Sequence, residues 1–478
     1  MWITFSLYLI ALLLLGALAT QRARSRDDFL LAGRRLGPFS AALSSGASSM
    51  SGWLLLGLPG KVFQVGLSAV WIAIGCLCGD YLNWKLTAAR LRDRAAQLGA
   101  LTLPEFITGC NEDRLSIITR MLAGAAVVFF MTIYLWAQVV ATGKALSGPL
   151  GIGLDYPTAI LMGSLVIVIY TALGGFLAIV WTDVLQGLMM LVTLVILPIY
   201  LLSMVAVQGG WESLMALDTI TPAGHARGDW FGGLAAFGIA AMLMSNFGVG
   251  AAYLGQPQLA ARFMALKSAR EAAVARRISV TWTALTATGA CTLALCAPAL
   301  LDTAPQDPEQ VILALSKQYL HPWVAGIVIA SILAAIMSSA DSFLIAAVSS
   351  IQLDFPGNLR NAAQSPWVSR LIILILGVIA TLLGWATDPS NPDRSVLALV
   401  HYAWAGLSIT LAVPLLYNLL AARPKISVVL LTIVGGLGLM IVWNVTHLAD
   451  KVYEVIPCLS FQLLICAAAH RFLSPTAS

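Results

Sequence analysis

Apolar runs of about twenty residues follow one another along almost the whole of this 478-residue sequence. As a helix, each run is long enough to cross the roughly 30 Å hydrocarbon core of a lipid bilayer. Hydrophobic residues make up 59% of the chain and charged residues 10%, whereas an average soluble protein has about 25% charged residues. The sequence therefore predicts an all-α, multi-pass membrane protein. Thirteen transmembrane helices are expected, at residues 2–20, 37–59, 66–88, 119–147, 157–178, 183–206, 230–255, 278–301, 321–346, 368–387, 396–420, 427–446 and 453–471.

The loops between these helices alternate in charge. Of the 27 Lys and Arg residues, 21 fall in the loops of one side, Arg262 among them, whereas the other side carries acids such as Asp302, Asp307 and Glu309. Because basic loops stay in the cytoplasm, we expect the N-terminus outside the cell and the C-terminus inside. The net charge of +5 therefore arises from short loops. It indicates membrane lipid, and not nucleic acid, as the surroundings of the chain.

One transmembrane run contains a stretch that is a poor helix former. Residues 44–53 read SSGASSMSGW, with small and hydroxyl-bearing side chains in place of large apolar ones. The glycines at 46 and 52 allow the backbone to leave helical geometry. In a bilayer, freed carbonyl and hydroxyl groups persist only where they are buried in protein or line a cavity. The stretch predicts either a helix break that holds a small cation and a polar solute, or close helix packing through small residues.

Three further polar patches lie at membrane depth, at residues 174–183, 246–257 and 334–342. The glycines of the second patch, with Tyr253 and Pro257, predict a second broken helix in the position equivalent to the first. The other two patches contain Asp183 and Asp341. A carboxylate within the membrane is a functional candidate by default, although it can also fix packing or, at the interface, face water.

A series of short stretches, spread in order over nearly the whole chain, resembles one transporter family. They are 45–48 (SGAS), 50–55 (MSGWLL), 57–60 (GLPG), 71–75 (WIAIG), 83–86 (NWKL), 101–104 (LTLP), 174–183 (GGFLAIVWTD), 255–257 (GQP), 261–265 (ARFMA), 275–279 (ARRIS) and 402–406 (YAWAG). The family that they resemble is the sodium:solute symporter family, and within it the bacterial sodium/proline symporters.

The resemblance implies a LeuT-type core built from two inverted repeats of five helices each. Residues 1–36 would then form the first transmembrane helix and a cytoplasmic loop, and residues 37–420 the ten-helix core. The repeats would cover about 37–206 and 230–420, and an odd number of helices in each places the two halves in opposite orientations. Residues 421–478 would supply two C-terminal helices and a short cytoplasmic tail.

The resemblance also implies a site for each transported species. Sodium would be held by the carbonyls of Ala47, Met50 and Ala335 and the hydroxyls of Ser338 and Ser339. Oxygen ligands suit a hard cation, and a helix break supplies unpaired carbonyls. Aromatic rings would cover an apolar ring such as that of proline, and helix ends would receive its carboxylate and ammonium groups. The implied solute contacts are Trp53, Tyr134, Tyr253 and Pro257, with Ser51 and Gly52 nearby.

The chain departs from the pattern of the proline symporters at three positions. Ser49 stands where they typically carry Asp, and losing that charge weakens sodium binding unless another acid compensates. Asp183 and Asp341 are the candidates, and Asp183 could belong to a second cation position. Val249 replaces an expected tryptophan and Ala252 a glycine. We therefore expect the solute pocket to differ in shape.

The prediction for the whole chain is sodium-coupled import of proline or a similar small amino acid by alternating access, across the cytoplasmic membrane of a bacterium. A proton-coupled or differently selective symporter remains an alternative, with Asp341 or His401 as the titrating group. A solute sensor is a further alternative, disfavoured by the short C-terminal tail. A channel or an enzyme is not predicted, because we find no repeated pore filter, nucleophile–base pair or metal motif.

Overall fold

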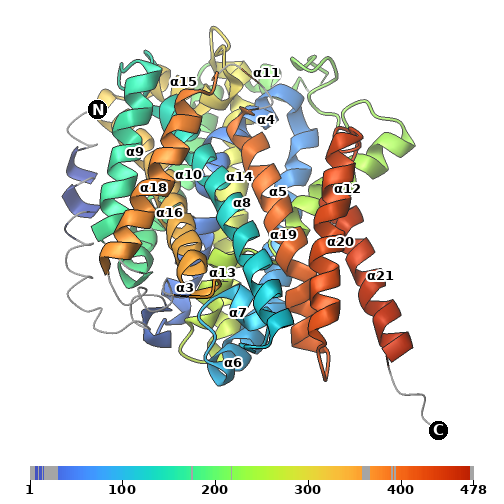
Figure 1. Cartoon of the computed structure of the whole chain (residues 1–478). Helices are drawn as coiled ribbons and strands as arrows, with labels where there is room; N and C mark the ends of the chain where they lie inside the picture. Colours follow the sequence, from blue (N-terminus) through green and yellow to red (C-terminus); the bar gives the residue numbers. More distant parts are fainter. Residues whose placement is uncertain are drawn as a thin grey trace.

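Long helices stand side by side in a single bundle (Figure 1). This computed structural model describes residues 6–8, 10–12, 14, 31–173, 176–216, 218–357, 366–388, 391 and 394–473. Within these residues the chain forms helices and no β-strand, which confirms the all-α prediction. Most of the predicted helix at 2–20, and the glycines at 174 and 175, lie outside the described residues.

The described helices have the following bounds. Up to residue 216 they are η1 (Ala32–Arg34), α3 (Pro38–Ser49), η2 (Trp53–Gly57), α4 (Leu58–Val65), η3 (Gly66–Ala69), α5 (Val70–Asn83), η4 (Trp84–Ala88), α6 (Ala89–Leu98), α7 (Leu103–Ile107), α8 (Arg114–Leu146), α9 (Tyr156–Leu173), α10 (Phe176–Val207) and α11 (Trp211–Met215). They continue with α12 (Ala236–Ala251), α13 (Pro257–Met264), η5 (Ala269–Glu271), α14 (Ala272–Leu300), η6 (Pro308–Gln310), α15 (Val311–Tyr319), α16 (Pro322–Leu353), α18 (Pro366–Trp385), α19 (Val396–Leu420), α20 (Ile426–Val445) and α21 (Val455–Leu473). Among the described residues, eight helical spans are long and apolar enough to cross a membrane, and α9, α12 and α21 are shorter apolar helices.

The first helix of the predicted core is broken, as residues 44–53 indicated. Helix α3 ends at Ser49, Met50 leaves helical geometry with φ −96° and ψ 30°, and a π-helical turn, η2, leads into α4. The glycines, however, act through packing and not through flexibility. A Cβ atom at Gly46 would lie 2.8 Å from the Trp282 ring, and one at Gly52 would lie 2.9 Å from the Ala141 Cβ. The break and the close packing therefore coexist in one stretch.

The second predicted break is also present. Helix α12 ends at Ala251 and α13 begins at Pro257, with a non-helical segment between them. Within this segment Gly255 has a φ of +118°, a conformation that favours glycine because it lacks a Cβ atom. Pro257 occupies the first turn of α13, where its missing N–H costs no hydrogen bond. Glycine and proline thus fix the two sides of the break.

Helices α16 and α19 form the centre of the bundle and are the most buried of the candidate spans. Helix α3 packs against α10, α14 and α16. Helices α20 and α21 lie at one edge of the bundle, and α9 and α18 lie at the opposite edge (Figure 1). Helices α5 and α12 approach each other backbone to backbone, since a Cβ atom at Gly75 or Gly79 would lie 2.1 Å from a carbonyl oxygen of α12. Small residues permit this spacing.

Backbone hydrogen bonds join the segment before α3 to the segment after α13. The Leu36 N–H donates to the Ala265 carbonyl at 3.0 Å, and the Lys267 N–H donates to the Leu36 carbonyl at 2.9 Å. The start of α3 and the end of α13 are therefore held together at the end of the bundle where α6 and α7 lie (Figure 1).

At the opposite end of the bundle, a buried lysine forms ion pairs with two acidic side chains. The Lys144 Nζ at the end of α8 lies 2.6 Å from Glu309 Oε2 and 2.7 Å from Asp307 Oδ2. The Glu309 carboxylate also accepts the N–H groups of Val396 and Leu397, both at 3.2 Å. A carboxylate at a helix N-terminus is stabilised by the helix dipole. The loop that follows α14 is thereby tied to α8 and to the start of α19.

Candidate functional site

Four of the predicted cation-binding groups meet near the break that ends α3. The Ser338 hydroxyl of α16 lies 3.0 Å from the carbonyl oxygens of Ala47 and Ala335. The Ser339 hydroxyl lies 3.3 Å from the Ala47 oxygen and 3.2 Å from the Ser48 oxygen. All of these residues are fully buried. A hydroxyl carries two lone pairs as well as its hydrogen, so each can turn from a donor to these carbonyls into a ligand of a cation.

Met50, the fifth predicted residue of this group, forms the turn at which α3 ends. Its N–H donates to the Gly46 carbonyl at 3.0 Å. The neighbouring Ser49 hydroxyl donates to the same carbonyl, also at 3.0 Å. Ser49 thus completes the helix end with a neutral hydrogen bond and contributes no charge to the oxygens beside it.

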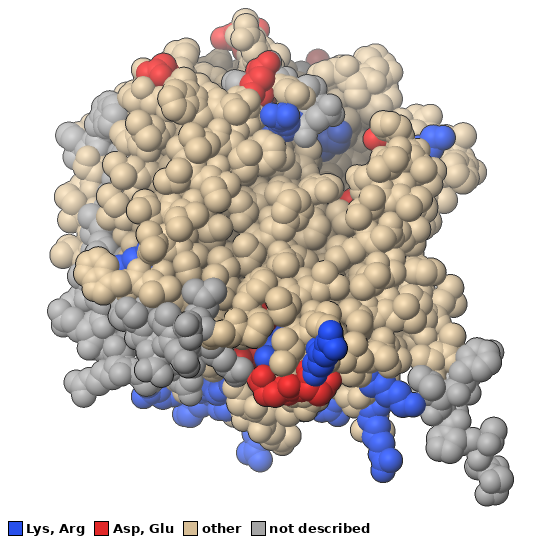
Figure 2. All heavy atoms as spheres, in the orientation of Figure 1, with Lys and Arg blue, Asp and Glu red and all other residues tan. Residues whose placement is uncertain are grey.

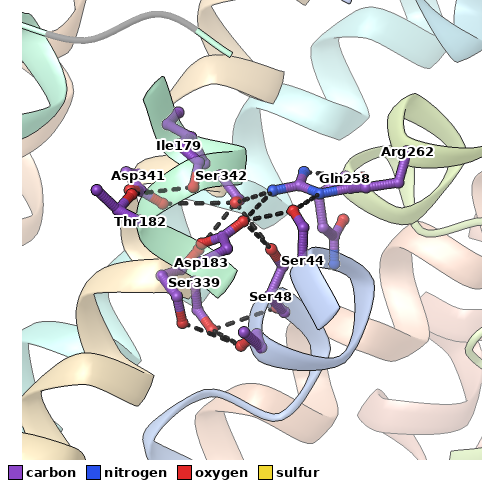
Figure 3. A network of polar contacts seen from close by, with 12 residues as sticks. Ser44, Ser48, Ile179, Thr182, Asp183, Gln258, Arg262, Ser339, Asp341 and Ser342 are labelled. Carbon is purple, nitrogen blue, oxygen red and sulfur yellow. Dashed lines mark hydrogen bonds and ion pairs between the residues drawn. The ribbon is translucent and has the colours of Figure 1, made fainter. Parts of the chain in front are cut away.

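A charged network lies directly beside these oxygens and is drawn in Figure 3. Asp183 of α10 accepts hydrogen bonds through Oδ2 from the Ser44 hydroxyl at 2.5 Å and from Arg262 Nη2 at 3.0 Å. Arg262 Nη2 also donates to the Ser342 hydroxyl at 2.6 Å. The Ser48 hydroxyl lies 3.0 Å from the Ser342 hydroxyl and 3.4 Å from Asp183 Oδ2. Ser48 therefore connects the network to the carbonyl cluster.

Arg262 corrects the sequence-based prediction. The charge pattern placed it in a cytoplasmic loop, but it lies in α13 with 1% of its surface exposed and forms an ion pair with Asp183. Its guanidinium also packs over the Phe176 ring, 5.0 Å from the ring centroid. In the sequence, only the presence of acids at membrane depth elsewhere in the chain indicated that a basic side chain would be buried to balance their charge.

Asp341 adds a second carboxyl group to this region, which contains a single guanidinium. It is fully buried in α16, and Oδ1 accepts one hydrogen bond, from the Ser342 hydroxyl at 3.4 Å, while Oδ2 has no hydrogen-bond partner within the described residues. Figure 3 shows Asp341 on one side of Ser342 and Arg262 approaching from the other, with Asp183 below Ser342. One guanidinium thus faces two carboxylates. Such an arrangement favours an additional cation nearby.

The predicted solute-binding aromatic residues gather around Trp404 of α19. The Trp404 ring centroid lies 4.9 Å from that of Tyr253, 6.2 Å from that of Trp53 and 6.3 Å from that of Tyr134. All three contacts are edge-to-face, and all four side chains are buried. Trp404 was part of the stretch 402–406 that carried the family resemblance, but its role was not predicted.

Two buried hydrogen-bond donors beside this cluster have no protein acceptor within the described residues: Trp404 Nε1 and Gln138 Nε2. The Gln138 Oε1 accepts the Gly52 N–H at 3.1 Å, which ties α8 to the broken helix. Gln138 was not predicted, although it follows Tyr134 by four residues and so lies on the same helix face. Ser51 is fully buried, and its hydroxyl accepts a hydrogen bond from the backbone N–H of Trp53 at 3.5 Å.

Pro257 lies apart from the aromatic cluster contacts described above. It lines a pocket on the α6–α7 side of the molecule, together with Gln258 and Arg262 of α13, Phe176 and Ser342. Arg262 and Ser342 belong to the charged network, so this network separates the pocket from the carbonyl cluster. The pocket is also lined by Leu103 and Pro104 of α7, so it lies between the charged network and the α7 end of the bundle.

Comparisons with known proteins identify one transporter family. The model of the sodium:solute symporter family matches residues 29–437. The chain is 37% identical to a sodium/proline symporter of Salmonella typhimurium over 96% of this chain and 90% of that protein. It is 34% identical to a high-affinity proline transporter of Bacillus subtilis over 95% of this chain and 94% of that protein.

Solved structures share the fold. A Na⁺-coupled sialic acid symporter superimposes with a TM-score of 0.72 and 18% identity, over 99% of this chain and 98% of that one. A nucleobase-cation-symport-1 family transporter superimposes with a TM-score of 0.53 and 13% identity, over 93% and 95% of the two chains. The LeuT-type fold and the non-enzymatic class predicted from the sequence are confirmed. The chain belongs to the sodium:solute symporter family.

Proposed function

We propose that this protein imports proline, or a similar small amino acid, by symport with sodium across the cytoplasmic membrane of a bacterium. One observation carries the proposal. The hydroxyls of Ser338 and Ser339 meet the carbonyls of Ala47 and Ser48 at a helix break. Clustered hydroxyl and carbonyl oxygens in a dry interior suit a hard monovalent cation. The relatives of this chain that are named as proline transporters supply the identity of the solute.

Sodium would be bound by the carbonyls of Ala47, Met50 and Ala335 together with the two serine hydroxyls. The ion would join α3 to α16, because these oxygens come from both helices. Binding then stabilises one arrangement of the broken helix. By thermodynamic linkage, sodium and solute each raise the other's affinity by the same factor.

The solute would lie among the aromatic rings of Trp53, Tyr134, Tyr253 and Trp404. Their faces and edges suit an apolar ring such as that of proline. The unpartnered donors Trp404 Nε1 and Gln138 Nε2 would receive the carboxylate, because a buried N–H without an acceptor is costly and an anionic acceptor relieves that cost. Ser51 and Gly52 would line the pocket from the broken helix, and Pro257 would line the route by which solute leaves.

Asp341 would supply the negative charge that Ser49 does not. The charge of Asp183 is balanced by Arg262 at 3.0 Å, whereas Asp341 has no ion-pair partner within the described part of the chain. Asp341 follows Ser338 by three residues on α16, so the two lie on neighbouring parts of one helix surface. Opposite charges attract strongly in a low-dielectric interior. Asp183 would take part in a second cation position only if Arg262 moved away.

The basic end of the molecule would face the cytoplasm. Figure 2 shows most of the Lys and Arg side chains on this face gathered at the end where α6 and α7 lie, while the opposite end carries mainly Asp and Glu. The positive-inside rule then places the N-terminus outside and the C-terminus inside. In this orientation the pocket beside Pro257 opens toward the cytoplasm, and the Lys144–Glu309 contact lies at the outer end.

Transport would proceed by alternating access between the two halves, about 37–206 and 230–420, within a ten-helix core of residues 37–420. The breaks support this division, since one follows α3 and the other follows α12, at equivalent places in the two halves. The Lys144–Glu309 contact would close the outer path and the Arg262–Asp183 pair the inner path. Residues 1–36 and 421–478 would flank the core.

The test is uptake of labelled proline into proteoliposomes that contain the purified protein, with and without an inward sodium gradient. We expect accumulation only with the gradient. Uptake that needs no sodium and follows a pH gradient instead would contradict sodium coupling. Sodium-driven uptake of another amino acid but not of proline would contradict the solute assignment and leave the coupling intact.

A further inference from the structure

A carboxylate that the proposed mechanism does not use lies between α5 and α14. Asp80 of α5 has 3% of its surface exposed. Its Oδ2 accepts hydrogen bonds from two hydroxyls of α14, Ser279 at 2.9 Å and Thr283 at 3.3 Å. Ser279 and Thr283 are four residues apart, so both project from the same face of α14 toward Asp80. The sequence-based search for intramembrane acids missed this residue.

No basic side chain neutralises Asp80 within the described residues. Lys85 of η4 and Arg276 of α14 lie with their charged groups over the ring of Tyr81, at 5.4 and 5.2 Å from its centroid, and Arg277 of α14 is exposed. The two hydroxyls and the neighbouring Trp84 side chain are all neutral, and they compensate only part of the cost of burying a charge. An intramembrane acid without a counter-charge favours binding of a cation.

Asp80 is placed to influence the solute site. Asn83, three residues further along α5, donates to the Tyr253 carbonyl at 2.9 Å. Tyr253 lies in the break between α12 and α13, and its ring packs against Trp404. The titratable groups that interact electrostatically with Asp80 are Cys76 of α5 and Tyr253, and these in turn interact with Cys291 of α14 and Tyr134 of α8. None of these side chains carries a positive charge in either protonation state.

We infer that Asp80, Ser279 and Thr283 form a second binding site for a transported monovalent cation. This inference rests on the proposed symport and adds to it. The carboxylate and the two hydroxyls provide oxygen ligands of the type that hard cations prefer. The occupant is sodium or a proton, since both satisfy the charge. Occupancy by either ion acts on the solute through α5, which holds the Tyr253 segment through Asn83.

The experiment compares wild type, Asp80→Asn and the control Asp93→Asn, which alters an exposed acid of α6. Labelled proline uptake into proteoliposomes is measured against sodium concentration, against pH at fixed sodium, and as charge carried per proline. If sodium binds, wild type has a Hill coefficient above one, and Asp80→Asn lowers it to about one and removes one charge per proline. If a proton binds, the Hill coefficient is unchanged and Asp80→Asn abolishes the pH dependence.

The inference is wrong if Asp80→Asn changes neither the Hill coefficient, the pH profile nor the charge per proline. If this variant does not fold, the pair Ser279→Ala and Thr283→Ala keeps the carboxylate and weakens the site. We then expect a several-fold shift in the sodium or proton concentration that half-activates uptake, and no shift would overturn the inference. Failure of the proposed function is separate, because wild-type uptake would then not respond to a sodium gradient.

Discussion

Replacing both hydroxyls of the carbonyl cluster tests the sodium site directly. A hydrogen-bonding group that contacts a charged partner contributes about 1.5 kcal/mol, so Ser338→Ala with Ser339→Ala removes about 3 kcal/mol of sodium binding. The same hydroxyls contact the carbonyls of Ala47 and Ser48, at 3.0 to 3.3 Å, in the described structure. Losing those neutral bonds destabilises the sodium-free protein by about 1 kcal/mol in total, which offsets part of the loss.

The net loss of about 2 kcal/mol corresponds to an increase of about 30-fold in the sodium concentration that half-activates uptake. The assay is initial proline uptake into proteoliposomes across a range of external sodium concentrations. Ser164→Ala is the matched control, because the Ser164 hydroxyl is also buried and bonds only to a carbonyl of its own helix, at 2.7 Å. A half-activating concentration within about twofold of wild type in the double variant would refute the site.

Three further substitutions test the neighbouring groups. Ser49→Asp should lower the half-activating sodium concentration, because it adds a negative charge beside the oxygens; an unchanged value would mean that Asp341 already supplies the field. Trp404→Phe keeps an aromatic ring but removes the unpartnered Nε1 donor, so the proline concentration for half-maximal uptake should rise about 5- to 30-fold, whereas an unaltered value would exclude this donor from the solute site. Arg262→Met leaves Asp183 buried without its partner and should destabilise the protein by about 3–5 kcal/mol, seen as a lower melting temperature in detergent. Adding Asp183→Asn should recover much of that loss, and equal melting temperatures of the single and double variants would show that the pair is not coupled.

The sequence predicted those features that depend on local composition. Small and hydroxyl-bearing residues around Met50, and glycine with proline between Tyr253 and Pro257, mark both breaks because these residue types are poor formers of a regular transmembrane helix. Apolar length likewise predicted the helices, since the bilayer fixes how many residues a crossing requires. The serines of α16 could be assigned to the cation site only through the family resemblance.

The features that the sequence did not predict depend on contacts between distant segments. Arg262 belongs to a stretch of the sequence that has the basic composition of a cytoplasmic loop. Only the position of α13 relative to α10 in the fold brings Arg262 to Asp183. Asp80 lies near the end of an apolar run, and its partners are about two hundred residues away on α14. The glycine at 46 was assigned to flexibility because its contact with Trp282 is invisible along the chain.

The backbone bonds between Leu36 and the segment after α13 have a mechanical consequence. They tie the start of α3, in the first broken helix, to the end of α13, in the second. Opening the path beside Pro257 would require either that α3 and α13 move together or that the two backbone hydrogen bonds between them are broken, which costs about 1–3 kcal/mol. Because joint movement avoids that cost, we expect the proposed sodium-binding segment of α3 and the proposed solute-lining segment of α13 to change position in the same step. In the proposed mechanism, these main-chain hydrogen bonds would then synchronise the release of ion and solute, independently of any side chain that contacts either of them.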